Sequence, residues 1–413
     1  MAKFLTIPPA LRHRKFTLYW VGLAISLAGS NMQLAALLWH LRELSPSPLV
    51  VSGIGVARFL PILLLAPFGG LAADAFNRRS IVFITQSVMI FTAAMLGWLT
   101  VSGQIQIWQI YLLTALQAVA NSFDIPARQA LMPNLIADKA DLAGAFSLQS
   151  IGVNLGAVLG PALSGVVIAA GGLGWVYFIN AVSFTAVQIA LLLMGKVEQE
   201  KGIRPGSVRA SLAAIREGWN FVWGTPLIVS TMLLDFFATF FASANTLLPF
   251  VARDILGVGA LEYGWLSAAQ SVGAVGVGIF ISQRAQIRRQ GRVLMASIAL
   301  IGIATMLFGL ARTFWAALIA LMLIGAGDSV NMIIRNTLRQ VNTPDALRGR
   351  MISLNQIFFQ GGPQLGEIEA GIAAALLGVP FAIISGGVGT LIAMFAVARR
   401  WPQLPKYQAL EVK

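Results

Sequence analysis

Long apolar runs recur from one end of this 413-residue chain to the other. A helix needs about 20 predominantly apolar residues to cross the hydrocarbon core of a bilayer. Division of the sequence at charged residues, prolines and glycine pairs gives twelve runs of this kind: 16–38, 49–71, 81–102, 107–126, 144–170, 174–195, 226–250, 263–283, 293–311, 314–334, 351–377 and 379–398. The sequence therefore predicts an all-α membrane protein with twelve transmembrane helices.

The composition supports a membrane protein and excludes a soluble globular one. Hydrophobic residues make up 57% of the chain and charged residues 11%, and the mean hydropathy is +0.78. The first apolar run is too long for a signal-peptide core and lacks a small-residue cleavage site, so we expect it in the mature protein. Without cysteine, the chain has no disulfides and no thiolate metal site.

The net charge of +13 comes from bases that lie mainly on one side of the predicted membrane. With a cytoplasmic N-terminus, all of the 29 Lys and Arg residues fall on inner segments except Arg42, Arg58, Arg253 and Arg312. Positive residues favour the cytoplasmic side of membrane proteins. We therefore expect both termini in the cytoplasm, a location in a bacterial inner or plasma membrane, and no nucleic-acid partner.

Two short motifs repeat about half a chain apart. ARQAL at 127–131 resembles IRNTL at 334–338, and FSLQSI at 146–151 resembles ISLNQI at 352–357. Both pairs fall at the connections from the fourth to the fifth and from the tenth to the eleventh segment. A parallel duplication of six helices is typical of transporters that are built from two halves.

The repeat divides the chain into two pseudo-symmetric six-helix bundles. We expect an N-terminal bundle at 1–195, a cytoplasmic linker at 196–225, and a C-terminal bundle with a short cytoplasmic tail at 226–413. Apolar residues at helical spacing in the linker predict an amphipathic helix on the inner membrane surface, with a plain tether as the alternative.

Polar residues inside the apolar segments indicate a water-filled cavity. A charge in the middle of a bilayer costs at least about 2.5–3.5 kcal/mol, so such residues need to face protein or water. Segments one, four, seven and ten carry polar stripes at helical spacing, whereas segments three, six, nine and twelve carry no charge and can face lipid. The alternative for each polar residue is a hydrogen bond between helices. The candidates for the cavity lining are Ser30, Gln33, Arg58, Gln117, Asn121, Asp124, Thr239, Asn331 and Arg335.

Four acids in the second half are candidates for proton coupling: Asp235, Asp328, Glu367 and Glu369. Desolvation favours the protonated form of a buried carboxyl group, so such a group can load and release a proton. Alternatively, these acids form ion pairs with Arg58 or Arg335 and fix the helix packing. Glu367 and Glu369 point to different helix faces, so at most one of them is expected at the cavity.

The stretch GGLAADAFNRR at 69–79 resembles the signature of the major facilitator superfamily between its second and third helices. The resemblance implies that Gly70, Asp74, Arg78 and Arg79 form a gating latch. A close helix crossing at Gly70 and an acid near a helix N-terminus at Asp74 fit this interpretation, and anchoring of the membrane topology is the alternative. The sequence departs from the signature at Ala75 and at Asn77, a residue type that tolerates left-handed backbone.

The stretch GAVLGPALSG resembles the antiporter signature of the same superfamily, which is associated with exporters. Gly156, Gly160, Pro161 and Gly165 occupy its positions. Glycines permit close packing and proline kinks a helix, which would let this helix rock against the other half. Ordinary packing of small residues is the alternative. Longer blocks, such as FDIPARQALMPNLIADKADLAGAFSLQS, resemble enterobactin exporters and macrolide-efflux proteins.

The resemblance implies a secondary transporter that works by alternating access and exports small, drug-like amphiphilic molecules against inward proton flow. The excess of intramembrane acids favours cationic substrates. The alternatives are export of a siderophore, transport of a lysophospholipid, and a receptor that transports nothing. An enzyme is not expected, because the two histidines lie far apart at the membrane margins, His40 as a solvated helix cap, and no nucleophile has a base beside it. We expect no cofactor, and a monomer, since one chain contains both halves.

Overall fold

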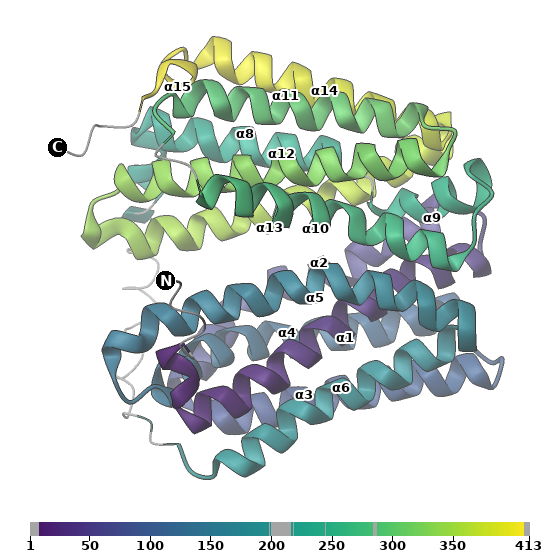
Figure 1. Cartoon of the computed structure of the whole chain (residues 1–413), viewed down its shortest axis with the longest axis vertical. Helices are drawn as coiled ribbons and strands as arrows, with labels where there is room; N and C mark the ends of the chain where they lie inside the picture. Colours follow the sequence, from purple (N-terminus) through teal and green to yellow (C-terminus); the bar gives the residue numbers. More distant parts are fainter. Residues whose placement is uncertain are drawn as a thin grey trace, which may run out of the picture. The chain divides into compact units, whose positions relative to one another are not determined.

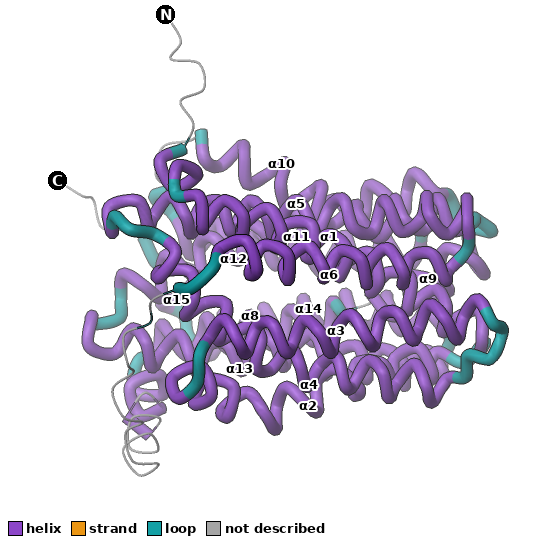
Figure 2. Tube along the Cα trace, turned by 90° about the horizontal axis from the view of Figure 1, so that it is seen from below, coloured by secondary structure: helices purple, strands orange, loops and turns teal. Residues whose placement is uncertain are grey.

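The structure is a computed structural model that describes residues 8–197, 199, 216–217, 219–243, 245–283 and 287–408. Only the backbone is described at 66–67, 345–346, 348–350, 352–354, 356–357 and 359–360. Throughout these residues the chain forms helices and loops without a β-strand (Figure 2). The expectation of an all-α protein is therefore confirmed.

Twelve long helices follow one another in the described chain (Figure 1). They are α1 (Arg14–Leu44), α2 (Pro48–Ala75), α3 (Arg78–Val101), α4 (Ile107–Leu131), α5 (Leu142–Gly171), α6 (Leu173–Met194), α8 (Pro226–Ala242), α10 (Ala260–Ser282), α11 (Gln290–Leu310), α12 (Phe314–Val341), α13 (Asp345–Leu377) and α14 (Val379–Arg400). Ten stretches of the described chain are long and apolar enough to cross a membrane, and α4 and α13 are the two helices outside these stretches.

The chain divides into two compact units. Unit 1 comprises residues 1–44 and 56–205, and unit 2 comprises residues 45–55 and 206–413. In unit 1, α1 packs on α5 and α6, and α3 packs on α4 and α6. In unit 2, α12 packs on α10 and α11, α14 packs on α11 and α8, and α13 packs on α8.

Both units share a distinctive turn between their last two helices. Gly172 lies between α5 and α6 with a φ of 87°, and Gly378 lies between α13 and α14 with a φ of 90°. Glycine adopts this backbone region without the steric cost that other residues have. The two glycines are separated by the same distance along the chain as the two sequence repeats, so the duplication extends to the backbone conformation.

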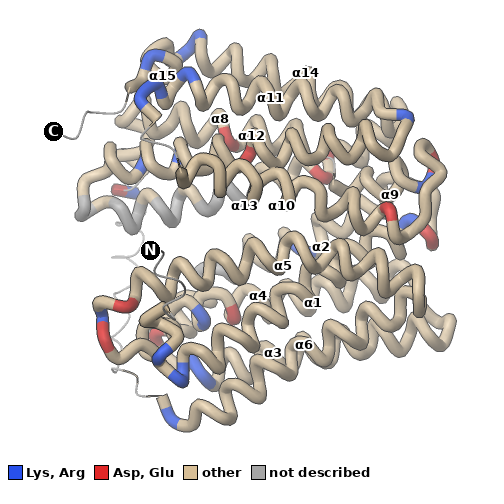
Figure 3. The backbone as a smooth tube through the Cα atoms, in the orientation of Figure 1, with Lys and Arg blue, Asp and Glu red and all other residues tan. Residues whose placement is uncertain are grey.

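Helix ends are set by local signals in the sequence. Asn77 caps α3, where its side chain accepts a hydrogen bond from Ser80 N at 3.1 Å, and Thr313 caps α12 in the same way. Charged residues gather mainly near the helix ends of each unit (Figure 3). The helix middles are mostly uncharged, as a low-dielectric surrounding requires.

The predicted seventh helix is shorter than expected. We expected one helix over 226–250, but α8 ends at Ala242, and a 3₁₀ turn (Asn245–Leu247), the short α-helix α9 (Leu248–Phe250) and a π-helical turn (Val251–Ile255) follow. Pro249 lies in the first turn of α9, where its missing backbone N–H needs no partner within the helix.

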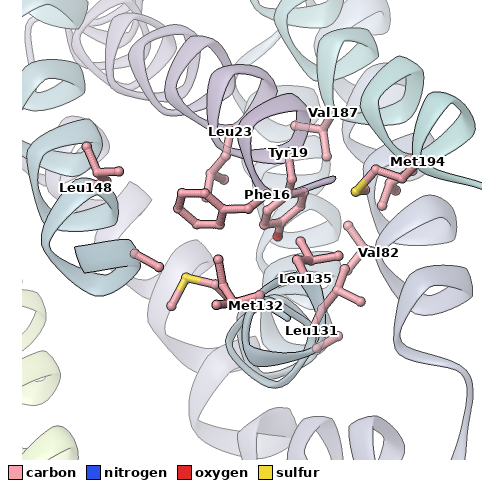
Figure 4. Close-up of a cluster of buried hydrophobic side chains, with 14 of the residues drawn as sticks. Phe16, Tyr19, Leu23, Val82, Leu131, Met132, Leu135, Leu148, Val187 and Met194 are labelled. Atoms are coloured by element: carbon pink, nitrogen blue, oxygen red, sulfur yellow. The ribbon is translucent and has the colours of Figure 1, made fainter. Parts of the chain in front are cut away.

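One end of unit 1 is closed by a buried apolar core. Phe16, Tyr19 and Leu23 of α1 lie in one cluster with buried side chains of other helices, among them Leu131 of α4 and Val187 of α6 (Figure 4). Each of these side chains is at most 5% exposed. A buried aliphatic or aromatic side chain contributes about 1.5–3 kcal/mol, so this cluster holds three helices together.

The linker helix that we expected within 196–225 is only partly described. Residues 198, 200–215 and 218 lie outside the described residues. Residues 216–217 and 219–224 are helical, and the rings of Trp219 and Trp223 lie 5.6 Å apart, each side chain 46% exposed.

Candidate functional site

A cavity of about 240 Å³ lies in unit 2 among α8, α10, α12 and α13. Half of the residues that line it carry polar side chains, and the other half are apolar or glycine. The polar side chains of the lining are Thr239, Ser243, Asn245, Gln270, Ser271, Asp328 and Asn331. Sites for small molecules combine apolar surface with placed polar groups that fix the orientation of the ligand.

Asp328 is the one charged residue among the described residues that line this cavity. It lies at the middle of α12, which begins at Phe314 and ends at Val341. Its side chain is nevertheless exposed, because it faces the cavity. The structure thus places a carboxyl group in the centre of a transmembrane helix with access to an internal space.

A polar stripe continues along α12 from the cavity toward the end of the helix. Asp328, Asn331, Arg335 and Arg339 follow one another at helical spacing, and the last three are at most 2% exposed. Arg335 forms an ion pair with Asp235 of α8, whose side chain is 1% exposed. The predicted alternative of an ion pair between these two residues is therefore present in the structure.

Arg339 extends this buried network. Its Nε donates to Thr231 Oγ1 of α8 at 3.0 Å, and its Nη1 donates to Asn355 Oδ1 of α13. The sequence analysis placed Arg339 on an inner segment and gave it no partner, and in the structure its side chain is 1% exposed inside the helix bundle. Its helical register with Asp328 and Arg335 was the signal that could have placed it there.

Glycines bring the helices around the cavity close together. A Cβ atom on Gly325 of α12 would overlap the carbonyl oxygen of Gln270 on α10, and one on Gly273 would overlap that of Met322. Likewise, a Cβ on Gly366 of α13 would overlap a backbone oxygen of α8. Backbone contact of this kind is available only to glycine.

Unit 1 holds a second buried carboxylate, Asp124 of α4. Its Oδ2 pairs with Nε of Arg128 one turn away at 2.6 Å, and its Oδ1 accepts hydrogen bonds from Thr85 Oγ1 at 2.8 Å and Gln86 Nε2 at 3.2 Å. The sequence repeat relates Arg128 to Arg335. Each unit therefore pairs the repeated arginine with a buried acid, on the same helix in unit 1 and on α8 in unit 2.

A second network in unit 1 consists of uncharged side chains. Gln33 Nε2 donates to Gln117 Oε1 at 2.8 Å, and Asn180 Nδ2 of α6 donates to Gln33 Oε1 at 2.6 Å. The predicted residues Gln33 and Gln117 are thus brought together. The sequence analysis missed Asn180, Thr85 and Gln86, because they lie on helices expected to face lipid. The side-chain amides of Asn180 and Gln86, each within an apolar segment, were the sequence feature that could have indicated these contacts.

The other predicted site residues are not among those that line the cavity. Glu367 of α13 is 7% exposed, whereas Glu369 is half-buried, so the two acids face different surroundings. Ser30, Arg58 and Asn121 are half-buried in unit 1.

The predicted gating loop is described in full and differs in detail from expectation. The close crossing of α2 lies at Gly69, where a Cβ would overlap the carbonyl oxygen of Ser122, while Gly70 has open space around it. Asp74 lies near the end of α2 and is exposed, and the cap of the next helix is Asn77. Asn77 has a φ of −67°, so its tolerance of left-handed backbone is not used.

Two arginines of this loop bind helix C-termini within unit 1. Arg78 Nη1 donates to the carbonyl oxygen of Ala130 and to Asn134 Oδ1, both at 3.0 Å, and Arg79 Nε donates to the carbonyl oxygen of Leu191 at 3.0 Å. Free carbonyl groups at helix C-termini attract cations. These contacts hold the start of α3 against the ends of α4 and α6.

The antiporter-type helix α5 packs its glycines on α1 of the same unit. A Cβ on Gly156 would press on the backbone of Leu27 and Ala28, and one on Gly160 would overlap Ala28 and Asn31. This glycine face is therefore occupied by α1 of the same unit. Pro161, Ser164 and Gly165 are buried on the same helix.

His40 is a further correction. We expected a solvated helix cap, but the side chain is 4% exposed, and its Nδ1 forms a hydrogen bond with the hydroxyl of Tyr177 at 2.9 Å. The predicted position near a helix end was correct, but α1 continues to Leu44, so His40 is covered by α6.

Comparison with known proteins identifies the family. The profile of the family described as "Transmembrane secretion effector" matches residues 6–413. A relative from Bacillus subtilis, "Uncharacterized MFS-type transporter YfiS", is 27% identical over 352 residues, 84% of this chain and 83% of the relative. "Enterobactin exporter EntS" of Salmonella typhimurium is 26% identical over 363 residues, 86% of this chain and 85% of the relative.

Solved structures agree on the fold. A bacterial homologue of the human lysosomal transporter Spinster, in an inward-facing and unoccupied conformation, has a TM-score of 0.74 at 14% identity and covers 98% of this chain and 100% of its own. A POT family transporter in complex with 5-aminolevulinic acid has a TM-score of 0.74 at 12% identity, covering 97% of this chain and 98% of its own. The chain therefore belongs to the transmembrane secretion effector family of the major facilitator superfamily, and it is a multi-pass membrane transporter and not an enzyme.

Proposed function

We propose that this transporter is a secondary active exporter of small, cationic, drug-like amphiphiles, and that it exchanges them for protons by alternating access. The observation that carries the proposal is the cavity of unit 2, with Asp328 at the midpoint of α12 as its one charge among the described lining residues. Transporters of this architecture bind substrate near the membrane midplane.

The chemistry of the cavity favours a cation with an apolar body. Ala238, Ile301 and Ile324 supply apolar surface, and Asp328 supplies a carboxylate that no base opposes among the described lining residues. At the lowered dielectric of a membrane protein, an ion pair with a bound cation is much stronger than in water. A cavity without a charged residue would bind the apolar part of the substrate but would not select for its positive charge.

Exchange follows from competition for one carboxylate. Asp328 can hold a proton or pair with a cationic substrate, and protonation removes the charge that binds the substrate. Entry of a proton from outside would therefore release the substrate, and loss of the proton to the cytoplasm would prepare the site for the next one.

The ion pair between Asp235 and Arg335 is the second part of the proposed coupling. It lies next to the cavity, because Thr239 and Asn331 are one helical turn away from its two members and line the cavity. Protonation of Asp235 would weaken the pair and free α8 to move against α12. Glu367 and Glu369 remain candidates for a further proton site on α13.

The remaining sequence expectations enter the proposal as parts of the gating machinery. The loop of Gly70, Asp74, Arg78 and Arg79 is proposed as the latch between conformations, in keeping with its anchoring contacts in unit 1. We further propose that the bundles 1–195 and 226–413 act as the two rocking halves of a monomer and that 196–225 links them.

Siderophore export is the second candidate, because relatives such as EntS are named enterobactin exporters. A catecholate siderophore is anionic and needs positive charge at its site. Arg335 and Arg339 are buried near the cavity, but the described lining contains no base. For this reason the cationic substrate is the first choice.

Accumulation of a fluorescent cationic dye in an efflux-deficient bacterial host tests the proposal. We expect the wild-type protein to lower accumulation, a protonophore to abolish this effect, and Asp328→Asn to reduce efflux at least about tenfold, since a charge-assisted interaction is lost. Asp138→Asn is the matched control, because it neutralises an exposed acid whose capping role asparagine can keep.

The outcomes separate the two candidates. If the wild type leaves dye accumulation unchanged, the cationic-drug proposal is wrong, and export of enterobactin from the same host becomes the assay. If the protein exports the dye and Asp328→Asn exports it equally well, the assignment of Asp328 to the substrate site is wrong.

The orientation of the chain gives a further prediction. The protein contains no cysteine, so a single introduced cysteine is a unique label. In spheroplasts, a membrane-impermeant thiol reagent is expected to label Ser102→Cys, in the exposed loop after α3, and not Gln403→Cys, after α14. Labelling of Gln403→Cys without prior lysis would show that the C-terminus is outside and that the proposed topology is inverted.

A further inference from the structure

A second hollow lies on unit 2, along α14. It is a groove of about 790 Å³ between α8 and α14, with an almost wholly apolar wall. Phe237, Phe241, Val388 and Ile392 contribute to its wall, and Val388 and Ile392 are 39% and 63% exposed. In a membrane-spanning unit, an exposed apolar helix face of this kind contacts lipid.

The groove is built by a close contact between its two helices. A Cβ on Gly389 of α14 would overlap the ring of Phe241 on α8. Because Gly389 has no side chain, the ring can pack directly against α14. The volume falls within the range of about 300–1,000 Å³ that is typical of sites for small ligands.

One end of the groove is charged and aromatic. Arg400 and Trp401 are part of the lining there, and the guanidinium carbon of Arg400 lies 5.3 Å from the centre of the Trp401 ring. Trp401 also packs against the cluster around Val222, in the helical segment that carries the exposed Trp219 and Trp223. Tryptophan and arginine together are typical of the level at which lipid head groups lie.

The dimensions match one leaflet. From Gly389 to Arg400 a helix rises by about 16 Å, and half of a bilayer's hydrocarbon core is about 15 Å thick. An acyl chain in the groove would therefore place its head group beside Arg400. The apolar wall fits the chain, and the single positive charge at the mouth fits a phosphate.

We propose that the groove between α8 and α14 is a binding site for one anionic phospholipid of the surrounding membrane, with an acyl chain on Phe241 and Val388 and the phosphate on Arg400. The groove shares helix α8 with the cavity of Asp328, because α8 supplies Phe237 to the groove and Thr239 to the cavity. Bound lipid would therefore stabilise the packing of α8, which the proposed transport cycle has to move.

Native mass spectrometry of the purified full-length protein tests this proposal. Phosphatidylglycerol and phosphatidylcholine with the same acyl chains are titrated separately in detergent. We expect one phosphatidylglycerol to bind with a half-saturating concentration about tenfold lower than that of phosphatidylcholine, whose choline group cancels the charge of its phosphate. A tenfold ratio corresponds to about 1.4 kcal/mol of extra binding free energy. Arg400→Gln is expected to remove this preference.

Two matched variants make the result specific. Arg399→Gln removes the neighbouring exposed charge, which does not line the groove, and it should keep the preference. Val388→Trp fills the groove and should weaken binding of both lipids, whereas Ile303→Trp on the exposed face of α11 should leave it intact. The proposal would be overturned if the wild-type protein bound the two lipids equally, or if Arg399→Gln lost the preference for phosphatidylglycerol as Arg400→Gln does. It would also be overturned if Val388→Trp bound both lipids as the wild type does.

Discussion

Replacement of Asp235 by asparagine is expected to lower the free energy of unfolding by about 3–5 kcal/mol, the usual effect of removing one member of a buried ion pair. The variant is nearly isosteric, so it changes the charge without opening a cavity. Asp235 and Arg335 are 1% and 2% exposed, and Arg339 is buried close by. Without the carboxylate, the buried guanidinium group of Arg335 would lose this ion pair.

Unfolding in mixed micelles, followed by circular dichroism while the fraction of denaturing detergent rises, measures this effect. Asp235→Asn combined with Arg335→Gln removes both charges and is expected to be more stable than Asp235→Asn alone, because no uncompensated charge remains at the pair. A double variant whose loss equals the sum of the single losses would show that the two residues do not interact.

The second large effect is expected from Gly325→Ala on α12. The added Cβ would overlap the backbone carbonyl of Gln270 on α10, and a backbone atom cannot rotate away as a side chain can. Overpacking in a tight interface costs about 1–3 kcal/mol. Because Gly325 and Gln270 line the cavity beside Asp328, we also expect efflux of the cationic dye to fall.

Gly276→Ala on α10 is the matched control. Nothing lies within 4 Å of the position that its Cβ would take. Alanine is favoured over glycine in a helix by about 1 kcal/mol, so this variant should be stabilised and should transport normally. The same melting and efflux assays apply to both variants, and a stable, active Gly325→Ala would contradict the close contact between α10 and α12.

The helices were predictable from the sequence because the bilayer imposes a length and a composition on each of them. All twelve expected segments correspond to helices, and the errors are confined to ends. The clearest error is α8, which we expected to reach residue 250 but which ends at Ala242. A window of mean hydropathy reports how apolar a segment is and does not register where its helical hydrogen bonds end.

The site was predictable in its residue types and only partly in its pairings. Asp235, Asp328 and Arg335 stood out as charges in apolar segments, which is costly wherever nothing compensates for it. The sequence left open whether each acid pairs with a base or faces a cavity. In the structure Asp235 forms an ion pair, while Asp328 lines the cavity.

The sequence by itself determined the membrane character, the twelve helices, the internal duplication and the family, because each of these depends on patterns that repeat along the chain. Only the tertiary structure decided which polar side chains meet, such as Asn180 with Gln33, and which glycines form contacts, such as Gly69 in place of Gly70. Such pairings depend on the rotation of each helix about its axis. That rotation is fixed by the packing of neighbouring helices and not by the hydropathy of the segment.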